Sequence, residues 1–344
     1  AAWYRKNRFD EKLVVKGHDP ATVAEALEAF AGGEKPEAVV AGKQSQIDGR
    51  CAFVFSGNGA QWPGMGRAAH VNNAQFRDKF EEIDREFAAL SGVSLTELLF
   101  SDALADDLHL TSTAQPLLFA IQVSLCAALA ELGLRPDVVI GHSIGEAAAA
   151  VVSGKMRLAE GVRLVYHRSR EQEAVAGAGS MAALVLPRDE ALEVIQKADC
   201  GQIELAAVNS PKSVTLSGRK EDLSEFGKFA RQFHLAFRKI DLNYPFHSSM
   251  VETVEHPFRE ALGEIKGRDS ATAFISTVSG EEMRGSELDT RYWWRNLREP
   301  VQFDAAISNA IAQGVRSFVE IGPKPTLQSY IRQCALGQDT DGAI

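Results

Sequence analysis

Cysteines, basic runs and long apolar stretches are all scarce in this sequence, and each scarcity argues against a class of protein. The four cysteines among 344 residues are widely scattered with no Cys-x-x-Cys spacing, which favours reduced thiols in the cytoplasm over a disulfide framework or a zinc site. No stretch approaches the ~18 consecutive apolar residues that span a bilayer. With no Lys/Arg-rich run and a net charge of −9, nucleic acid is not an expected partner. We therefore expect a cytoplasmic protein without a metal site or a membrane span.

The sequence does contain enough apolar residues for a large core. Apolar residues make up 45% and charged residues 24%, as in ordinary soluble globular proteins. The length exceeds that at which a single core usually stops growing, so we expect a large domain with a smaller companion. The N-terminus has neither an initiating Met nor the apolar core of a signal peptide, so we expect a piece of a longer protein.

Strand and helix patterns alternate through most of the chain. The apolar run Cys51–Phe55 predicts a buried strand that leads into a glycine-rich loop. A helix is expected from near Thr113, with Pro116 in its first turn. Asp137–Ile140 predicts a buried parallel strand, and Glu146–Val152 the small-residue start of the next helix. This alternation predicts an α/β fold in which helices cover a parallel sheet.

Residues 180–242 follow a different rhythm of strand, helix, strand and then strand, helix, strand. Two βαβ halves in that order predict a ferredoxin-like subdomain. Residues 48–179 and 243–344 are then expected to form one large domain with a parallel sheet, of the α/β-hydrolase-like kind, into which the subdomain is inserted. Residues 1–47 predict two short strands and a helix, which is too little to fold alone.

The segment Gly141-His142-Ser143-Ile144-Gly145 lies between the predicted strand and the predicted helix. Gly-x-Ser-x-Gly in this context is a nucleophile elbow, whose glycines permit a strained turn that lifts the serine oxygen clear of the sheet. The following helix adds its N-terminal dipole and free N–H groups, which favour a developing oxyanion. As a bare pattern the motif is weak, and the alternative is a structural turn. The flanking strand and helix lead us to predict that Ser143 is a nucleophile.

A nucleophilic serine needs a base, and the sequence contains eight histidines. His142 adjoins the serine, but adjacent side chains on a strand point to opposite faces, so we expect it to pack beneath the elbow. His247 stands where the small subdomain returns the chain to the large domain, and a domain junction is a usual place for a cleft. By position alone it is either the base or an ordinary loop histidine. The remaining six are expected at the surface: His18, His70, His109, His167, His234 and His256.

The loop Gly57-Asn58-Gly59-Ala60-Gln61-Trp62-Pro63-Gly64 follows the first buried strand. It is close to a dinucleotide-binding fingerprint, but Trp62 stands where the third glycine of that motif belongs. We therefore exclude a bound dinucleotide cofactor. The loop is better suited to bring backbone N–H groups beside the elbow as the second half of an oxyanion hole.

Six segments occur in the order in which one family has them: Phe53–Gly66, Gly141–Glu146, Arg168-Ser169-Arg170, Tyr244–Ser248, Tyr292–Val301 and Glu320–Pro323. Over nearly its whole length the chain resembles the acyltransferase domains of modular type I polyketide synthases, relatives of the malonyl-CoA:carrier-protein transacylases. That resemblance implies that residues 1–47 are the remnant of a linker between a ketosynthase and its acyltransferase.

The resemblance also assigns roles to residues. Ser143 would be the nucleophile and His247 the general base, in a dyad without a carboxylate. The N–H groups of Ile144 and Asn58 would form the oxyanion hole, although the family usually has Gln at the position of Asn58. The family orients its base through a backbone carbonyl, and the matching position here is Asn296.

Arg168 matches the arginine that the family pairs with the free carboxylate of malonyl-type substrates. A planar guanidinium binds a carboxylate through two charge-assisted hydrogen bonds, so the residue type suits that role. Without the resemblance, an arginine among Arg163, Arg170 and Glu171 would be interpreted as part of a charged helix surface. Gln115 matches a position that lines the family's pocket.

The residues before the base correlate with the substrate in this family. Patterns ending in Phe-His accompany malonyl, and Tyr-x-Ser-His accompanies methylmalonyl, whereas this chain has the mixed Tyr244-Pro245-Phe246-His247. The ring of Phe246 leaves less room for a methyl branch than a serine would. Ile144 favours the same substrate, since related methylmalonyl enzymes often carry Gln there. We therefore predict malonyl-CoA ahead of methylmalonyl-CoA.

The predicted activity is a ping-pong acyl transfer from acyl-CoA to the phosphopantetheine thiol of an acyl carrier protein, with no bound cofactor. Expected partners are that carrier protein and a ketosynthase domain on the same polypeptide. The main alternative is a serine hydrolase or an editing thioesterase, but lipase-like enzymes often carry a His-Gly-Gly-Gly loop that is absent here. A scaffold that has kept the fold without catalysis is the second alternative.

Overall fold

The structure, a computed structural model, describes residues 11–43 and 49–336, which divide into two compact units at residue 48. The first unit holds the strands β1 (Glu11–Val15) and β2 (Val39–Lys43), paired antiparallel, and the helix α1 (Pro20–Ala31) between them. Asp19 caps α1 by accepting a hydrogen bond of 2.8 Å from the Thr22 N–H.

The second unit is built on a five-stranded sheet in the order β10-β9-β4-β3-β12. Four strands run parallel, namely β3 (Arg50–Phe55), β4 (Val138–Gly141), β9 (Ala273–Ile275) and β12 (Val315–Ile321); β10 (Glu282–Met283) is antiparallel at one edge. Every residue of β4 and β9 is buried, as expected of parallel strands covered on both faces. The predicted α/β class with a parallel sheet is confirmed.

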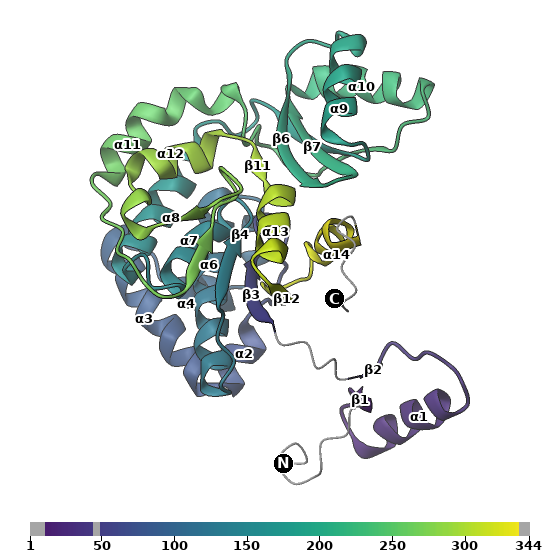
Figure 1. The fold of residues 1–344 in the computed structure, drawn as a ribbon. Coiled ribbons are helices and arrows are strands. Elements are labelled where there is room, and N and C mark those ends of the chain that lie inside the picture. The colour runs from purple at the N-terminus through teal and green to yellow at the C-terminus, as the bar shows by residue number, and fades with distance from the viewer. Residues whose placement is uncertain (1–10, 44–48, 337–344) are drawn as a thin grey trace. The chain divides into compact units, whose positions relative to one another are not determined.

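Helices cover this sheet from both sides (Figure 1). One face packs against α3 (Ala74–Ser91), α6 (Thr111–Glu131), α7 (Gly145–Val152) and α8 (Leu158–Glu173), and the other against α13 (Phe303–Ala312) and α14 (Gln328–Leu336). Among the described residues, α6 alone is long and apolar enough to cross a membrane, but 72% of its apolar window is buried inside the protein. That burial is typical of a core helix.

The shorter helices of this unit fill the connections between strands: α2 (Arg67–Asn72), α4 (Leu95–Phe100), α5 (Leu104–Asp107), η1 (Ser249–Val254), α11 (Glu255–Leu262), η2 (Gly285–Glu287) and α12 (Thr290–Arg298). The helical segment 249–262 is split into η1 and α11. Pro257 explains the split, because it has no N–H for the Thr253 carbonyl one turn earlier.

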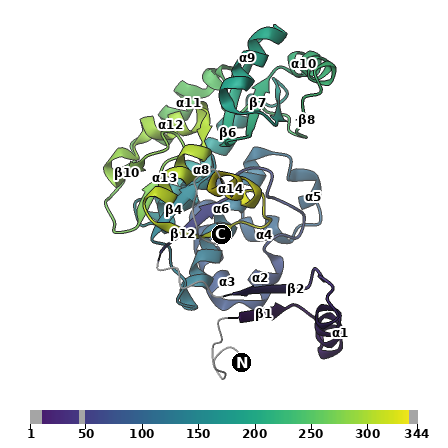
Figure 2. The ribbon, with the colours of Figure 1, turned by 45° about the vertical axis from the view of Figure 1, so that its right-hand side comes forward.

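A second sheet has the order β11-β6-β7-β5-β8. Figure 2 labels three of its strands, β6, β7 and β8. Residues 180–242 supply β5 (Ser180–Leu184), α9 (Arg188–Ala198), β6 (Ile203–Ser210), β7 (Ser213–Gly218), α10 (Lys220–Gln232) and β8 (Phe237–Lys239). Apolar residues of α9 and α10 pack on this sheet in a separate small core. The fifth strand, β11 (Val301–Gln302), comes from beyond residue 242 and runs parallel to β6. The segment before α13 therefore joins the two sheets.

Candidate active site

The elbow is a sharp turn between β4 and α7 centred on Ser143. The φ of Ser143 is 54°, in the left-handed region that costs a side chain free energy. A methyl group at Gly141 would collide with the Glu146 backbone, and one at Gly145 with the backbone of Phe55 and Ser56. The two glycines are therefore required by close packing of the turn against its own helix and against β3.

The side chains of Ser143 and His247 meet although 104 residues separate them. Ser143 Oγ lies 2.8 Å from His247 Nε2, and His247 Nδ1 lies 2.8 Å from the carbonyl oxygen of Glu299. Because a carbonyl can only accept, Nδ1 carries the hydrogen, and Nε2 is left to accept the serine proton. Burial, followed by the positive charge of Arg168, lowers the pKa of His247 to about 3, so the ring is neutral.

The prediction for Asn296 is wrong in one respect, because the carbonyl that orients His247 belongs to Glu299. Glu299 caps the end of α12 in an extended conformation, so its carbonyl is turned out of the helix, whereas Asn296 lies within α12. The Asn296 side chain instead contacts the elbow, where Nδ2 donates to Ser143 O at 3.1 Å and to Glu146 Oε2 at 2.8 Å.

Arg168 is fully buried rather than on a surface, with 1% of its area exposed. One guanidinium nitrogen, Nη2, donates to Ser143 Oγ at 3.2 Å. The other, Nη1, donates to the side-chain oxygens of Gln115 at 2.9 Å and Gln172 at 3.2 Å, and Gln115 Nε2 donates to Gln172 Oε1 at 2.7 Å. Burial lowers the pKa of Arg168 to about 9, against the opposing effect of the Glu146 carboxylate. A buried cation held by neutral groups is thus placed at the serine oxygen.

Gln172 is a site residue that the sequence analysis did not identify. It lies four residues after Arg168 on α8, and residues at that spacing share a helix face. That spacing was the available signal, but nothing in the sequence shows which face of α8 is buried.

The glycine loop after β3 packs directly against the elbow. A methyl group at Gly57 would come within 2.7 Å of the His142 carbonyl oxygen, so the loop backbone at Gly57 packs closely against the elbow. Asn58 is the next residue along the loop. Ile144 is the residue before the first turn of α7, where N–H groups have no partner within the helix. The loop is anchored from its far side by Trp62, whose Nε1 donates to Pro323 O at 3.0 Å. The loop therefore stands beside the N-terminus of α7.

Tyr244 and Phe246 stack on each other with parallel rings 5.1 Å apart. Both are buried, in a cluster with Met181 and Ala206 of the second sheet. The Tyr244 hydroxyl donates to Glu173 Oε2 at 2.9 Å at the end of α8. The residues before the base are thus fixed between the second sheet and the helix that carries Arg168.

Two other histidines have specific surroundings. His142 Nε2 lies 2.9 Å from Asn209 Oδ1 of β6, so it faces the second sheet and is only partly buried. The surface position expected for His70 is wrong, because its ring is buried edge-on between the rings of Phe80 and Phe100. The apolar side chains on α3 and α4 close over α2, which the short polar pattern of α2 does not indicate.

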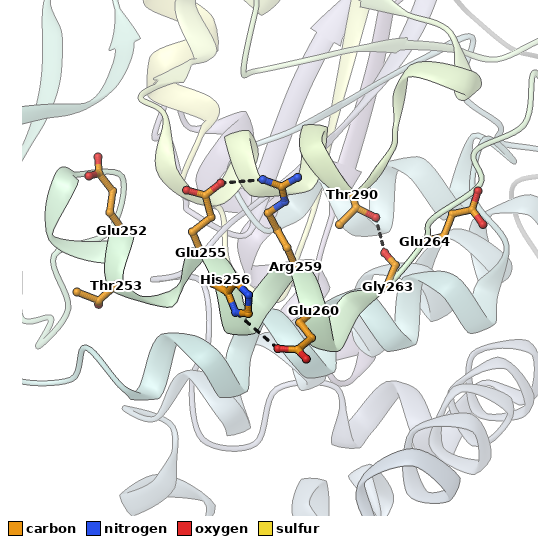
Figure 3. A pocket seen from close by; sticks show the side chains of 9 residues that line it. All are labelled: Glu252, Thr253, Glu255, His256, Arg259, Glu260, Gly263, Glu264 and Thr290. Atoms are coloured by element: carbon orange, nitrogen blue, oxygen red, sulfur yellow. Dashed lines mark hydrogen bonds and ion pairs between the residues drawn. The ribbon is translucent and has the colours of Figure 1, made fainter.

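The depression in Figure 3 contains none of the predicted site residues. It lies along η1 and α11, where Glu255 pairs with Arg259 at 3.0 Å and His256 with Glu260 at 3.5 Å. These pairs indicate a solvated helix surface. Within residues 11–43 and 49–336, no cluster of His, Cys, Asp or Glu has the composition of a metal site.

We compared the sequence with protein-family models and with curated proteins. The model of the acyl transferase domain family matches residues 52–342. Among curated proteins, Polyketide synthase GfsE of Streptomyces halstedii is 35% identical over 98% of the chain, and Mycoketide-CoA synthase of Mycobacterium tuberculosis is 35% identical over 97%. The chain spans only 9% and 8% of those two proteins.

Solved structures of similar folds include single acyltransferase domains. The acyltransferase domain from module 8 of the salinomycin polyketide synthase has a TM-score of 0.90 at 31% identity, covering 98% of this chain and 80% of that one. A malonyl CoA-acyl carrier protein transacylase from Clostridium perfringens has a TM-score of 0.75 at 28% identity, covering 83% of this chain and 90% of that one. The chain belongs to the acyl transferase domain family, among the acyltransferase domains of modular polyketide synthases.

Proposed function

We propose that the chain takes a malonyl group from malonyl-CoA onto Ser143 and passes it to the phosphopantetheine thiol of an acyl carrier protein. The observation that carries the proposal is the contact of Ser143 Oγ with both His247 Nε2 and Arg168 Nη2. A base and a cation at one hydroxyl suit a nucleophile whose substrate is an anion.

In the first half-reaction, His247 Nε2 takes the hydroxyl proton as Ser143 Oγ attacks the thioester carbonyl carbon. The N–H groups of Ile144 and of Asn58, near the start of its loop, would stabilise the oxyanion. The carbon–sulfur bond then breaks, and His247 returns its proton to the departing CoA sulfur. In the second half, His247 accepts the proton of the carrier's thiol as its sulfur attacks the acyl carbon. The bond between that carbon and Ser143 Oγ then breaks, and His247 returns the proton to the serine oxygen.

Arg168 would bind the substrate carboxylate and, in doing so, assist the base. Its charge lowers the pKa of His247, so a bound carboxylate that neutralises Arg168 makes the imidazole a better proton acceptor. A carboxylated acyl group would therefore be favoured in the chemical step as well as in binding. Gln115 and Gln172 hold the guanidinium in place from its other side.

We propose a preference for malonyl over methylmalonyl because the ring of Phe246 is bulky and is held in place by stacking on Tyr244. One methyl group in a pocket changes the free energy of the transition state by about 1–3 kcal/mol. Competition of the two CoA thioesters, read by the mass of the acyl-enzyme, tests this preference. A Phe246→Ser variant should move the ratio toward methylmalonyl, and dominance of the methylmalonyl adduct in the parent would contradict the preference.

A hydrolase would share the elbow and the base but would release free acid. We propose that the acyl-enzyme persists without carrier protein and is discharged when the carrier is added. Following free malonate and malonyl-carrier over time separates the two activities. Rapid release of malonate without carrier would favour the hydrolase.

We also propose the following domain organisation and cellular location. Residues 1–47 would be the end of a linker from a ketosynthase, and residues 48–179 with 243–344 the large domain of α/β-hydrolase-like kind. The βαββαβ order and the sheet order β6-β7-β5-β8 support a ferredoxin-like insertion over residues 180–242. The four cysteines are free, which supports a cytoplasmic location.

A further inference from the structure

A fully buried carboxylate lies directly behind the elbow, and the proposed reaction does not use it. Glu146 is the first acidic residue after Ser143, on the first turn of α7, and none of its surface is exposed. Its Oε1 accepts hydrogen bonds from the N–H and the hydroxyl of Thr277. Its Oε2 accepts from the Tyr292 hydroxyl and from Asn296 Nδ2 at 2.8 Å.

This carboxylate costs the protein stability. Burial raises the pKa of Glu146 to about 7, despite the four hydrogen bonds that oppose the change. The folded state therefore holds a proton that the unfolded state releases between about pH 4.5 and 7, so stability falls as the pH rises through that range. A neutral amide of the same shape would avoid this cost, which indicates that the negative charge serves something other than stability.

The acceptor-only character of a carboxylate determines how the Asn296 amide is turned. One N–H of Nδ2 points to Glu146 Oε2 and the other donates to the carbonyl oxygen of Ser143 at 3.1 Å. Asn296 Oδ1 is buried and has no hydrogen-bond partner among the described residues. The amide thus leaves one polar atom unpaired in order to hold the nucleophile's own backbone.

The hydrogen-bond partners of Glu146 also connect it with α12, the helix whose end orients His247. Thr277 Oγ1 also lies 2.8 Å from the Gly141 carbonyl oxygen, and the hydroxyl therefore shares its one hydrogen between that oxygen and Glu146 Oε1. Tyr292 and Asn296 both belong to α12. The end of α12 supplies the Glu299 carbonyl that orients His247. One carboxylate therefore connects the elbow with the helix that positions the base.

We propose that Glu146 is a positioning residue, which acts through Asn296 to hold the strained backbone of Ser143 in register with His247. The proposal rests on the proposed function of Ser143. A glutamine at position 146 would present an N–H where Oε2 now lies. The Asn296 amide would then turn over, pair its Oδ1 with that N–H, and withdraw Nδ2 from the Ser143 carbonyl.

The test compares Glu146→Gln, Asn296→Ala and the double variant in single-turnover acylation by malonyl-CoA, measured by intact mass. Displacement of reacting groups by about 1 Å costs about 100-fold, so we expect each single variant to lose about 10- to 100-fold in rate. The double variant should lose no more than Asn296→Ala, because both act through one hydrogen bond. The unfolding temperature of Glu146→Gln should equal or exceed that of the parent, which a merely structural role would not allow.

The pH profile supplies a second readout. A proton on Glu146 has the same effect as the amide, so the parent's acylation rate should fall below about pH 7, whereas the rate of Glu146→Gln should be low and flat. The other charged or titratable groups acting on this carboxylate are Tyr292 and Arg168, both of which keep one charge state across that range. His247 stays neutral there as well.

Asp84→Asn is the matched control, an acid-to-amide change at a carboxylate that accepts from the Leu95 N–H at 2.6 Å, outside the elbow cluster. It should acylate like the parent. If the parent and this control form no adduct on Ser143, the proposed function fails. If they do form it, a parent-like rate in Glu146→Gln, or additive losses in the double variant, would overturn the positioning role alone.

Discussion

Ser143 and His247 both adopt left-handed backbone conformations, with φ of 54° and 56°, but different parts of the chain hold them there. Ser143 is fixed largely by its own neighbours, since Gly141 and Gly145 allow β4 and α7 to pack around the turn. His247 is fixed by a carbonyl 52 residues further along, at the end of α12. The proposed nucleophile is therefore a local feature of the sequence, whereas the proposed base is brought to it only in the folded chain.

The largest effect should come from removing the base. His247→Ala leaves the serine without a proton acceptor, and general base catalysis contributes about 10²–10⁴-fold. We expect acylation by malonyl-CoA to slow by that factor while the elbow stays intact. Single-turnover mass measurements check the loss, with His109→Ala, an exposed histidine, as the control. A loss of less than about tenfold would show that His247 is not the base.

Alanine substitutions at two glycines test whether close packing of neighbouring residues fixes the turn at Ser143. Gly145→Ala forces a methyl group into the backbone of β3, so we expect a loss of about 3 kcal/mol or more in unfolding free energy. Gly133→Ala meets no atom within 4 Å and carries only the strain of its positive φ of 80°, so it should cost about 1–2 kcal/mol. Denaturant unfolding compares them. Equal losses would mean that close packing does not shape the elbow.

Arg168 contacts Ser143 Oγ from a separate helix, α8, and its removal should slow transfer of carboxylated acyl groups only. Arg168→Ala should slow malonyl transfer by about 10- to 100-fold, the worth of a hydrogen-bonded charge, and leave acetyl transfer unchanged or faster. Parallel assays with malonyl-CoA and acetyl-CoA measure the ratio. Arg170→Ala, on the same helix but exposed, is the matched control. Equal losses with both substrates would contradict the carboxylate role.

The smallest effect concerns how much stability the protein loses in acid because His247 is buried as a neutral ring. The pKa of His247 is lowered from 6.5 to about 3 in the folded protein, so the unfolded chain binds more protons between those values. The stability that the protein has with a neutral His247 is therefore complete above about pH 6.5 and is lost as the pH falls toward 3. We expect the unfolding temperature of the parent to fall more steeply below pH 6.5 than that of His247→Gln. Parallel curves would indicate a ring that is already charged when folded.

The same contrast explains what could be predicted from the sequence. The strand, the glycines and the serine of the elbow are adjacent in the chain, so pattern and propensity were sufficient to predict the turn. The domain junction made His247 a candidate base but did not separate it from an ordinary loop histidine. Only the family resemblance assigned its role and that of Arg168, because their spacing from Ser143 carries no geometric information. The sequence did not show that Arg168 is buried, since its charged neighbours on α8 indicate a surface.

The features that the sequence analysis missed depend on tertiary packing. The carbonyl of Glu299 faces His247 because α12 ends before Pro300, and no pattern shows where that end lies relative to the base. The acceptor role of Glu146 likewise requires Thr277 and α12 to close over the elbow. The fifth strand of the second sheet is only two residues long and has no pattern that a sequence analysis could detect.

The central claim is that Ser143 carries the acyl group during transfer. Mixing the protein with malonyl-CoA, quenching in acid and sequencing the proteolytic peptides by mass spectrometry would locate the adduct. We predict a malonyl ester on Ser143 that is absent from Ser143→Ala and disappears when carrier protein is added. An adduct at another residue, or equal labelling of the Ser143→Ala variant, would contradict it.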